Sequence, residues 1–140
     1  MNAQELSKGS DYVVHPKCLK YEIKGKDEVE QCFFRNLLED VSAKTYYLLQ
    51  VNKITYIDLK SEVKFTINEE GEFENLEFFG SEINKKFVKE SFDSYLKDYA
   101  KKKKKIISAK DADGISIKKS YYIPFNLKKG FTEFNQIQNQ

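Results

Sequence analysis

The stretch SEVKFTINEEGEFENLEFF, residues 61–79, decides the fold. Its first part, Ser61–Asn68, has an apolar side chain at every second position, the period of a strand with one buried face; these positions are Val63, Phe65 and Ile67. The acidic turn that follows contains Gly71, which can adopt the positive φ that tight turns need. Phe73–Phe79 then reads as a second strand, so the stretch predicts a β-hairpin.

The residues before the hairpin predict a lead-in and a helix. We expect residues 13–27, which contain a proline and a glycine, to be extended. Asp27 is the expected N-cap of a helix whose apolar residues recur at three- and four-residue spacings; the stripe comprises Val29, Cys32, Phe33, Leu37 and Val41. Residues 46–60 are rich in Tyr, Ile and Leu, and we expect them to begin as helix and end as strand.

A second helix follows the hairpin. Ser81 or Asn84 begins it, and Lys101–Lys105 closes it, where cations are favoured by the helix dipole. Its apolar face has helical spacing and includes Val88, Phe92, Tyr95 and Tyr99. We interpret the lysine run as a solvated helix end; contact with anionic lipid, cell wall or nucleic acid is the alternative.

The last long strand, Ile115–Leu127, follows a turn at residues 111–114. Because the second helix returns the chain, this strand runs antiparallel to the first strand and can pair on its free side. The predicted strand order is therefore 2-1-3. Pro124 favours an edge position, since a proline cannot donate to the hydrogen-bond ladder. We predict an α+β fold with a three-stranded antiparallel sheet and two helices packed on one face.

The length of 140 residues fits one domain. We expect a flexible linker or tail at residues 1–12, the folded domain at residues 13–128 and a polar tail at residues 129–140.

Composition argues against several classes of function. The net charge is +2, and Arg35 is the only arginine, so a dedicated nucleic-acid binder is not expected. No apolar run reaches the length of a membrane helix, and the start lacks a signal-peptide core. The sequence is therefore either cytosolic or trimmed of a targeting segment. It also lacks a phosphate-binding Gly-rich loop and a nucleophile elbow, so we expect neither enzyme activity nor a cofactor.

The two cysteines, Cys18 and Cys32, leave two interpretations open. In an oxidising compartment they could form a disulfide, and otherwise they are buried thiols. His15 is the only histidine, so a metal site is not expected, and the residue reads as part of a loop rather than a catalytic group.

Several segments together resemble the C-terminal domain of TonB-type energy transducers. VKFTINEEGEFENLEF (residues 63–78) is similar to the hairpin of that family, and INKKFVKESFDSYLKDY (residues 83–99) stands where its long helix lies. SAKDADGISIKKSYYIPFNL (residues 108–127) resembles its final turn and strand. The lead-in at residues 13–18, followed by Cys32 in a helix, is similar to transducers of the Bacteroidetes type. The resemblance covers roughly residues 13–128.

This resemblance implies a periplasmic module that binds protein. The expected partner is a short segment of an outer-membrane transporter, which adds as a strand to the edge of the sheet. The family further implies an anchor in the inner membrane and contact with a proton-channel complex there, through an N-terminal segment that this chain does not contain.

The physical properties of an edge strand point to the same site. Its free N–H and C=O groups can pair with an extended peptide. Tyr121 and Tyr122 must face opposite sides of the sheet, so one of them remains available to a partner. We therefore expect the site within Ser116–Asn126, with these partner-binding residues: Ser116, Ile117, Lys118, Lys119, Ser120, Tyr121, Tyr122, Ile123 and Phe125. Lys118 and Lys119 would either repel stray strands or attract an acidic partner.

Two further hypotheses come from other classes. The domain could be a sensory module that holds a small apolar ligand between helix and sheet, in a pocket lined by Phe65, Phe78, Phe92 and Tyr95. It could also form a homodimer by edge pairing or domain swapping, with a structural role.

Overall fold

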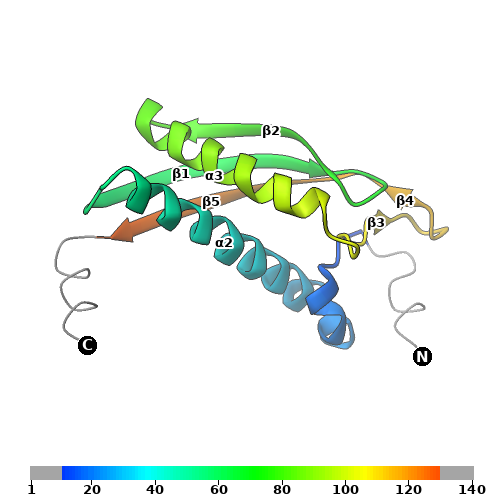
Figure 1. Cartoon of the computed structure of the whole chain (residues 1–140). Coiled ribbons are helices and arrows are strands. Elements are labelled where there is room, and N and C mark those ends of the chain that lie inside the picture. Colours follow the sequence, from blue (N-terminus) through cyan, green and yellow to red (C-terminus); the bar gives the residue numbers. More distant parts are fainter. Residues whose placement is uncertain (1–10, 130–140) are drawn as a thin grey trace.

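The computed structural model describes residues 11–129, so the tails expected at residues 1–12 and 129–140 fall almost entirely outside the described residues. The described part contains one 3-10 helix, two α-helices and five strands (Figure 1). In chain order these are η1 (Pro16–Lys24), α2 (Lys26–Val51), β1 (Ile57–Ile67), β2 (Phe73–Gly80), α3 (Glu82–Ala100), β3 (Ala109–Lys110), β4 (Ser116–Ile117) and β5 (Lys119–Lys129).

The main sheet has the predicted fold. Its three strands are antiparallel in the order β2-β1-β5, which is the predicted order 2-1-3. Val63 lies at the centre, opposite Phe78 of β2 on one side and Ile123 of β5 on the other. Figure 1 shows α2 and α3 together on one face of this sheet. The predicted α+β class and topology are therefore confirmed.

The predicted last strand is wrong in one respect: Ile115–Leu127 is not continuous. Ser116–Ile117 form β4, which pairs with β3 in a separate two-stranded sheet, and β5 starts at Lys119. The cause is local, because Asp111 Oδ1 accepts hydrogen bonds from the N–H groups of Asp113 and Ile115. This side-chain turn folds the chain back on itself before the main sheet begins.

The first helix differs from its prediction at both ends. It runs from Lys26 to Val51, and its N-cap is Gly25 rather than Asp27, which lies in the first turn. Residues 46–51 are thus helical and β1 starts at Ile57, so the expected change from helix to strand is confirmed. The lead-in predicted as extended contains η1 instead, because Pro16 suits the first turn of a helix.

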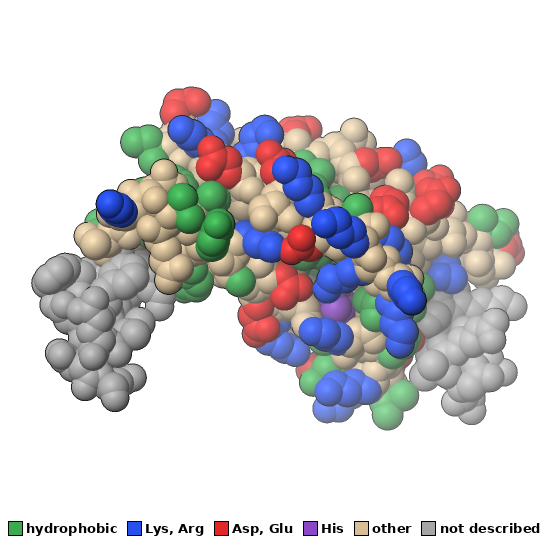
Figure 2. Space-filling model, viewed as in Figure 1, with side chains coloured by type: hydrophobic (Ala, Val, Ile, Leu, Met, Phe, Trp, Pro, Cys, Tyr) green, Lys and Arg blue, Asp and Glu red, His purple; other side chains and the backbone are tan. Residues whose placement is uncertain are grey.

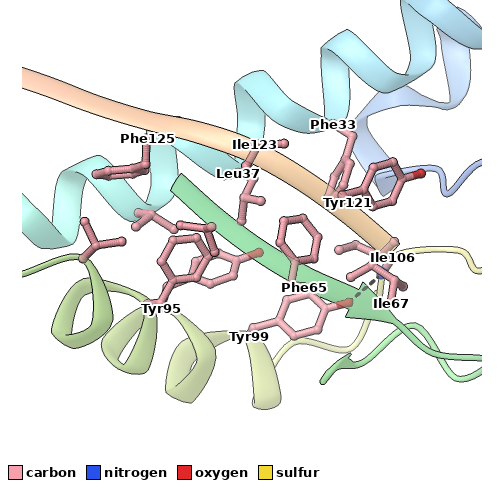
Figure 3. Packing of buried hydrophobic residues seen from close by; sticks show 14 of the residues in the cluster. Phe33, Leu37, Phe65, Ile67, Tyr95, Tyr99, Ile106, Tyr121, Ile123 and Phe125 are labelled. Carbon is pink, nitrogen blue, oxygen red and sulfur yellow. Dashed lines mark hydrogen bonds between the residues drawn. The ribbon is translucent and has the colours of Figure 1, made fainter. Parts of the chain in front are cut away.

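A continuous core lies between the helices and the sheet (Figure 3). Phe33 and Leu37 of α2, Phe65 of β1, Phe92 of α3 and Phe125 of β5 are all almost fully buried in it. The ring of Phe92 lies 5.7 Å from that of Phe78 and 6.2 Å from that of Phe125, so α3 joins both outer strands. The apolar stripes predicted for the two helices therefore form one core.

Tyr99 fixes the end of α3 to the hairpin turn. Its hydroxyl donates to the carbonyl of Gly71 at 2.6 Å and accepts from the N–H of Ile106 at 2.7 Å, the second of which is drawn in Figure 3. Burial raises the pKa of this hydroxyl to about 12, so it stays protonated at neutral pH. Gly71 has a φ of 76°, and a Cβ there would lie 2.0 Å from the carbonyl oxygen of Ile106. The predicted glycine turn is confirmed, and the turn leaves no room for a side chain at position 71.

A smaller cluster holds the N-terminal segment against α2. A disulfide joins Cys18 of η1 to Cys32 of α2, with the two Cα atoms 5.9 Å apart. Tyr12, which was assigned to the tail, is buried in this cluster, and Val14 forms a β-bridge with Ile107. A cross-link of this loop size contributes about 3 kcal/mol in the chain-entropy description.

Within residues 11–129, no helix is both long enough and apolar enough to cross a membrane.

Candidate functional site at the free edge of the sheet

The outer strand β5 pairs on one side only. Its residues from Lys119 to Lys129 face Ile67 to Ile57 of β1 in an unbroken antiparallel register. No other described strand pairs with its opposite side. The strand is therefore a long, regular edge, as the sequence predicted.

The register identifies which backbone groups point outward. The carbonyl of Lys60 points toward β2, since it accepts from Asn84 at 3.0 Å and lies 3.0 Å from the Cβ position of Gly80. Backbone groups alternate between the two sides along an antiparallel strand. Lys60 faces Asn126 on β5, so the backbone groups of Asn126 point away from β1.

The same alternation applies along the whole of β5. Tyr122 and Pro124 lie two and four residues before Asn126, so their backbone groups also point to the free edge, as do those of Ser120 and Lys128. The N–H that Pro124 lacks is therefore missing from the free edge and not from the ladder with β1. An added strand meets free donors on either side of Pro124 and only a carbonyl at the proline itself.

The two adjacent tyrosines face opposite sides, as predicted. Tyr121 is 7% exposed, and its hydroxyl accepts from the N–H of Val13 at 3.1 Å. Burial raises the pKa of Tyr121 above its ordinary value. Tyr122 is 56% exposed, its ring lies 5.7 Å from that of Phe79, and its hydroxyl donates to Glu62. Tyr122 is thus the aromatic residue of β5 that a partner can reach.

The other predicted site residues have varied surroundings. Ile123 and Phe125 are buried in the core, so their contribution to the edge is structural. Ser120 is exposed on the edge, with its hydroxyl 2.8 Å from that of Thr66. Lys119 is half-buried at the start of β5.

Three of the predicted residues are not on the free edge of β5. Ser116 and Ile117 pair with β3. Lys118 reaches Glu74 of β2 in an ion pair of 2.7 Å, and this contact holds the pKa of Glu74 below its ordinary value. The free edge therefore starts three residues later than the site that the sequence predicted, and Lys118 is already paired with an acidic group of this chain.

A groove on α2 lies beside β5, and sequence reasoning missed it. It has a volume of about 650 Å³. Phe34, Leu38, Ser42 and Tyr46 follow one stripe of the helix at four-residue spacing, apolar except for Ser42, and the groove is also lined by Gln31, Arg35 and Glu39. The ring of Phe34 lies 5.4 Å from that of Tyr121, which brings this end of the stripe into contact with β5, and Figure 1 shows α2 on the same side of the sheet as this contact. The neighbouring pairs Phe33–Phe34 and Leu37–Leu38 were a signal, because they make the apolar face of this helix wider than its core contact needs.

The opposite face of the sheet carries a second, smaller hollow. It has a volume of about 250 Å³ and is lined on three strands by residues that include Glu62, Phe79 and Pro124. Tyr122 and Phe79 stand on this uncovered face. Both faces next to the free edge thus offer apolar surface.

The other edge of the sheet is interrupted. The register between β1 and β2 shifts between Lys64 and Thr66, and on β2 this leaves an additional residue at Asn75, whose φ is +56°. Such a bulge twists a strand and blocks the regular pairing of an added strand. Of the two outer strands described for the main sheet, only β5 offers an unbroken edge.

No family model, curated protein or solved structure matches this chain significantly.

Proposed function

We propose that this domain binds a short extended peptide as a fourth strand on β5. The observation that carries the proposal is the unbroken outer side of β5 with the apolar stripe of α2 next to it. An added strand takes its affinity from main-chain hydrogen bonds and its specificity from pockets for alternate side chains.

The geometry specifies the pattern of the ligand. Along a strand, every second side chain of the peptide would face α2 and lie over Phe34, Leu38 and Tyr46. The side chains between them would lie on the uncovered face, near Tyr122 and Phe79. We expect a ligand with apolar residues at alternate positions on the helix side.

The resemblance to TonB-type transducers supports a specific partner. We propose that the peptide is a segment of an outer-membrane transporter, and that the domain works in the periplasm as part of an energy transducer. The disulfide between Cys18 and Cys32 fits an oxidising compartment of this kind. Attachment to the inner membrane and to a proton channel there would depend on a segment outside this chain.

The test uses two sets of peptides and fluorescence anisotropy. The first set consists of overlapping peptides, called tiles, that together cover the periplasm-exposed segments of outer-membrane transporters from the source organism. The second contains a decapeptide that alternates valine with threonine and one with the same residues in two blocks. A transporter tile and the alternating peptide should bind, and the blocked peptide should bind weakly. If the alternating peptide binds and no tile does, the transporter is the wrong partner; if neither binds, the edge is not a peptide site.

A matched pair of variants tests the groove. Ser42 lies in it, whereas Ala43 is the next residue of α2 and is exposed outside it. Ser42→Asp should weaken binding about tenfold or more, because it introduces a charge under the apolar side chains of the peptide. Ala43→Asp makes the same change in net charge and should alter affinity less than about twofold. Equal effects of the two variants would show that the groove does not contact the peptide.

The interior is a less favourable binding site than the edge. The four aromatic residues considered for an apolar ligand include Phe78, Phe92 and Tyr95, and the ring of Phe92 contacts those of the other two at 5.7 and 6.4 Å. Because these rings pack against one another, we place the binding function on β5.

A further inference from the structure

A third pocket lies at the opposite end of α3 from its N-cap. It has a volume of about 400 Å³ and is formed where the start of η1 meets the chain after α3. His15 and Lys17 line it from one side, and Lys102–Lys104 from the other, with the rings of Tyr95 and Tyr99 in its wall. Figure 2 shows basic side chains close to the histidine on this face of the molecule.

The lysines of this pocket form no salt bridge among the described residues, although Asp98 lies near enough to Lys102, and Asp40 near enough to His15, to interact electrostatically. Lys44 pairs with Asp98 nearby, and Lys105 lies 3.8 Å from Glu72. No ion pair within residues 11–129 involves Lys17 or Lys102–Lys104. Four lysines therefore line one pocket without a salt bridge, in a chain whose net charge is only +2.

The end of a helix explains only part of this charge. The negative C-terminal end of α3 favours lysines directly after it. Lys17, however, comes from η1, which the disulfide and the bridge between Val14 and Ile107 hold in place. Lysines from two separate elements are thus brought to the same pocket by the fold.

His15 provides a hydrogen-bond donor in the same pocket. Its side chain is 9% exposed, and its Nδ1 accepts from the N–H of Lys17 at 3.1 Å. In the neutral imidazole the proton is then on Nε2. Nε2 makes no hydrogen bond to a described side chain or backbone group that would occupy this donor.

We propose that this pocket binds the phosphate group of a small phosphate ester. Several lysines around one site match a multiply charged anion better than a single carboxylate, and lysine binds phosphate as a point charge. The Nε2–H of His15 would donate to a phosphate oxygen. A volume of about 400 Å³ lies within the range of small-molecule sites, so there is room for an organic part against the tyrosine rings.

The test uses His15 as a reporter, since it is the only histidine in the chain and its ring protons give one set of NMR signals. The probes are glucose 6-phosphate, inorganic phosphate, and vesicles of phosphatidylglycerol or phosphatidylcholine, at constant ionic strength. Saturable shifts with glucose 6-phosphate support a free ester as the ligand. Broadening with phosphatidylglycerol vesicles alone assigns the phosphate to a lipid headgroup. No change of the His15 signals with any phosphate probe overturns the proposal.

Two triple variants distinguish binding in the pocket from long-range attraction by the positive charge of the protein. Lys102→Gln, Lys103→Gln and Lys104→Gln together should weaken the interaction about tenfold or more. The control, Lys60→Gln, Lys64→Gln and Lys86→Gln, removes the same charge from exposed residues outside the pocket. It should weaken binding less than about threefold, by the loss of long-range attraction alone. Equal losses in both variants would overturn the site.

A substitution at His15 tests the donor. His15→Asn retains an acceptor for the N–H of Lys17 and loses the donor at Nε2. The affinity of the pocket for glucose 6-phosphate, measured by calorimetry with His15→Asn as the only substitution, should fall about threefold to tenfold. Unchanged affinity in this folded variant would show that His15 does not contact the phosphate.

Discussion

The two outer strands of the sheet differ in whether their free sides can pair regularly with another strand. β2 has eight residues, carries a bulge at Asn75 and ends in Gly80. β5 has eleven residues and keeps one register along its whole length, with Pro124 as its only break in donors. Natural proteins protect sheet edges from pairing with other chains, and a long regular edge left open is a place for such pairing. The comparison shows that a backbone bulge blocks regular pairing at the edge of β2, whereas the edge of β5 remains open to pairing.

The largest expected effect is on stability at the closed side. Gly71→Ala places a Cβ 2.0 Å from the carbonyl oxygen of Ile106, at a φ of 76°. We expect a loss of about 3 kcal/mol or more in the free energy of unfolding, because the turn must shift and the bond to Tyr99 is strained. Urea unfolding followed by circular dichroism measures this. A loss below about 1 kcal/mol would show that the turn is not rigid.

The open side should respond in binding rather than in stability. Tyr122→Pro removes an N–H that faces the free edge and leaves the ladder with β1 intact, whereas Tyr122→Ala removes the same ring and keeps the N–H. Relative to Tyr122→Ala, we expect the proline variant to bind the alternating peptide about tenfold more weakly. Titration by anisotropy compares the two. Equal affinities would contradict the assignment of this N–H to the binding edge.

Restoring the N–H that Pro124 lacks should strengthen strand pairing at the free edge of β5. Pro124→Thr supplies the missing donor on the free side, so peptide affinity should rise about twofold to tenfold. The same variant should self-associate more, which sedimentation velocity detects. A lower affinity in a variant that unfolds at the same urea concentration would mean that the ring of Pro124 itself contacts the ligand.

The smallest expected effect is on the pH dependence of stability, which involves His15 and not the free edge of β5. Burial, together with the charges of Lys17 and Lys102, holds the pKa of His15 below its ordinary value against the opposing effect of Asp40. The unfolded chain therefore takes up a proton more readily, so the stability present above the ordinary pKa of about 6.5 declines as the pH falls below it. His15→Asn should remove this part of the decline between pH 7.5 and pH 5.5 in urea unfolding. Peptide affinity depends on main-chain hydrogen bonds, so it should not change with the protonation of His15.

Much of the main sheet could be predicted from local patterns. The alternation at Val63, Phe65 and Ile67 gave the first strand its buried face, and the return path of α3 gave the strand order. The opposite orientations of Tyr121 and Tyr122 follow from the period of a strand alone. These features depend on residues that are near one another in the chain.

Other features depended on contacts that the sequence does not display. The break before β5 comes from the side chain of Asp111, and the pairing of Lys118 with Glu74 crosses the sheet. The stripe of Phe34 and Leu38 could be recognised as apolar, but its place beside a free edge appears only when α2 is packed on the sheet. The pairing of Cys18 with Cys32 likewise required η1 to be positioned against α2.

Amide hydrogen exchange with and without the alternating peptide tests the central claim most directly. We predict that the amides of Ser120, Tyr122, Asn126 and Lys128 exchange fast in the free domain and become protected with peptide, while those of Tyr121, Ile123 and Phe125 are protected in both states. Protection that appears on β2 instead, or bound peptide without any change along β5, would contradict the account.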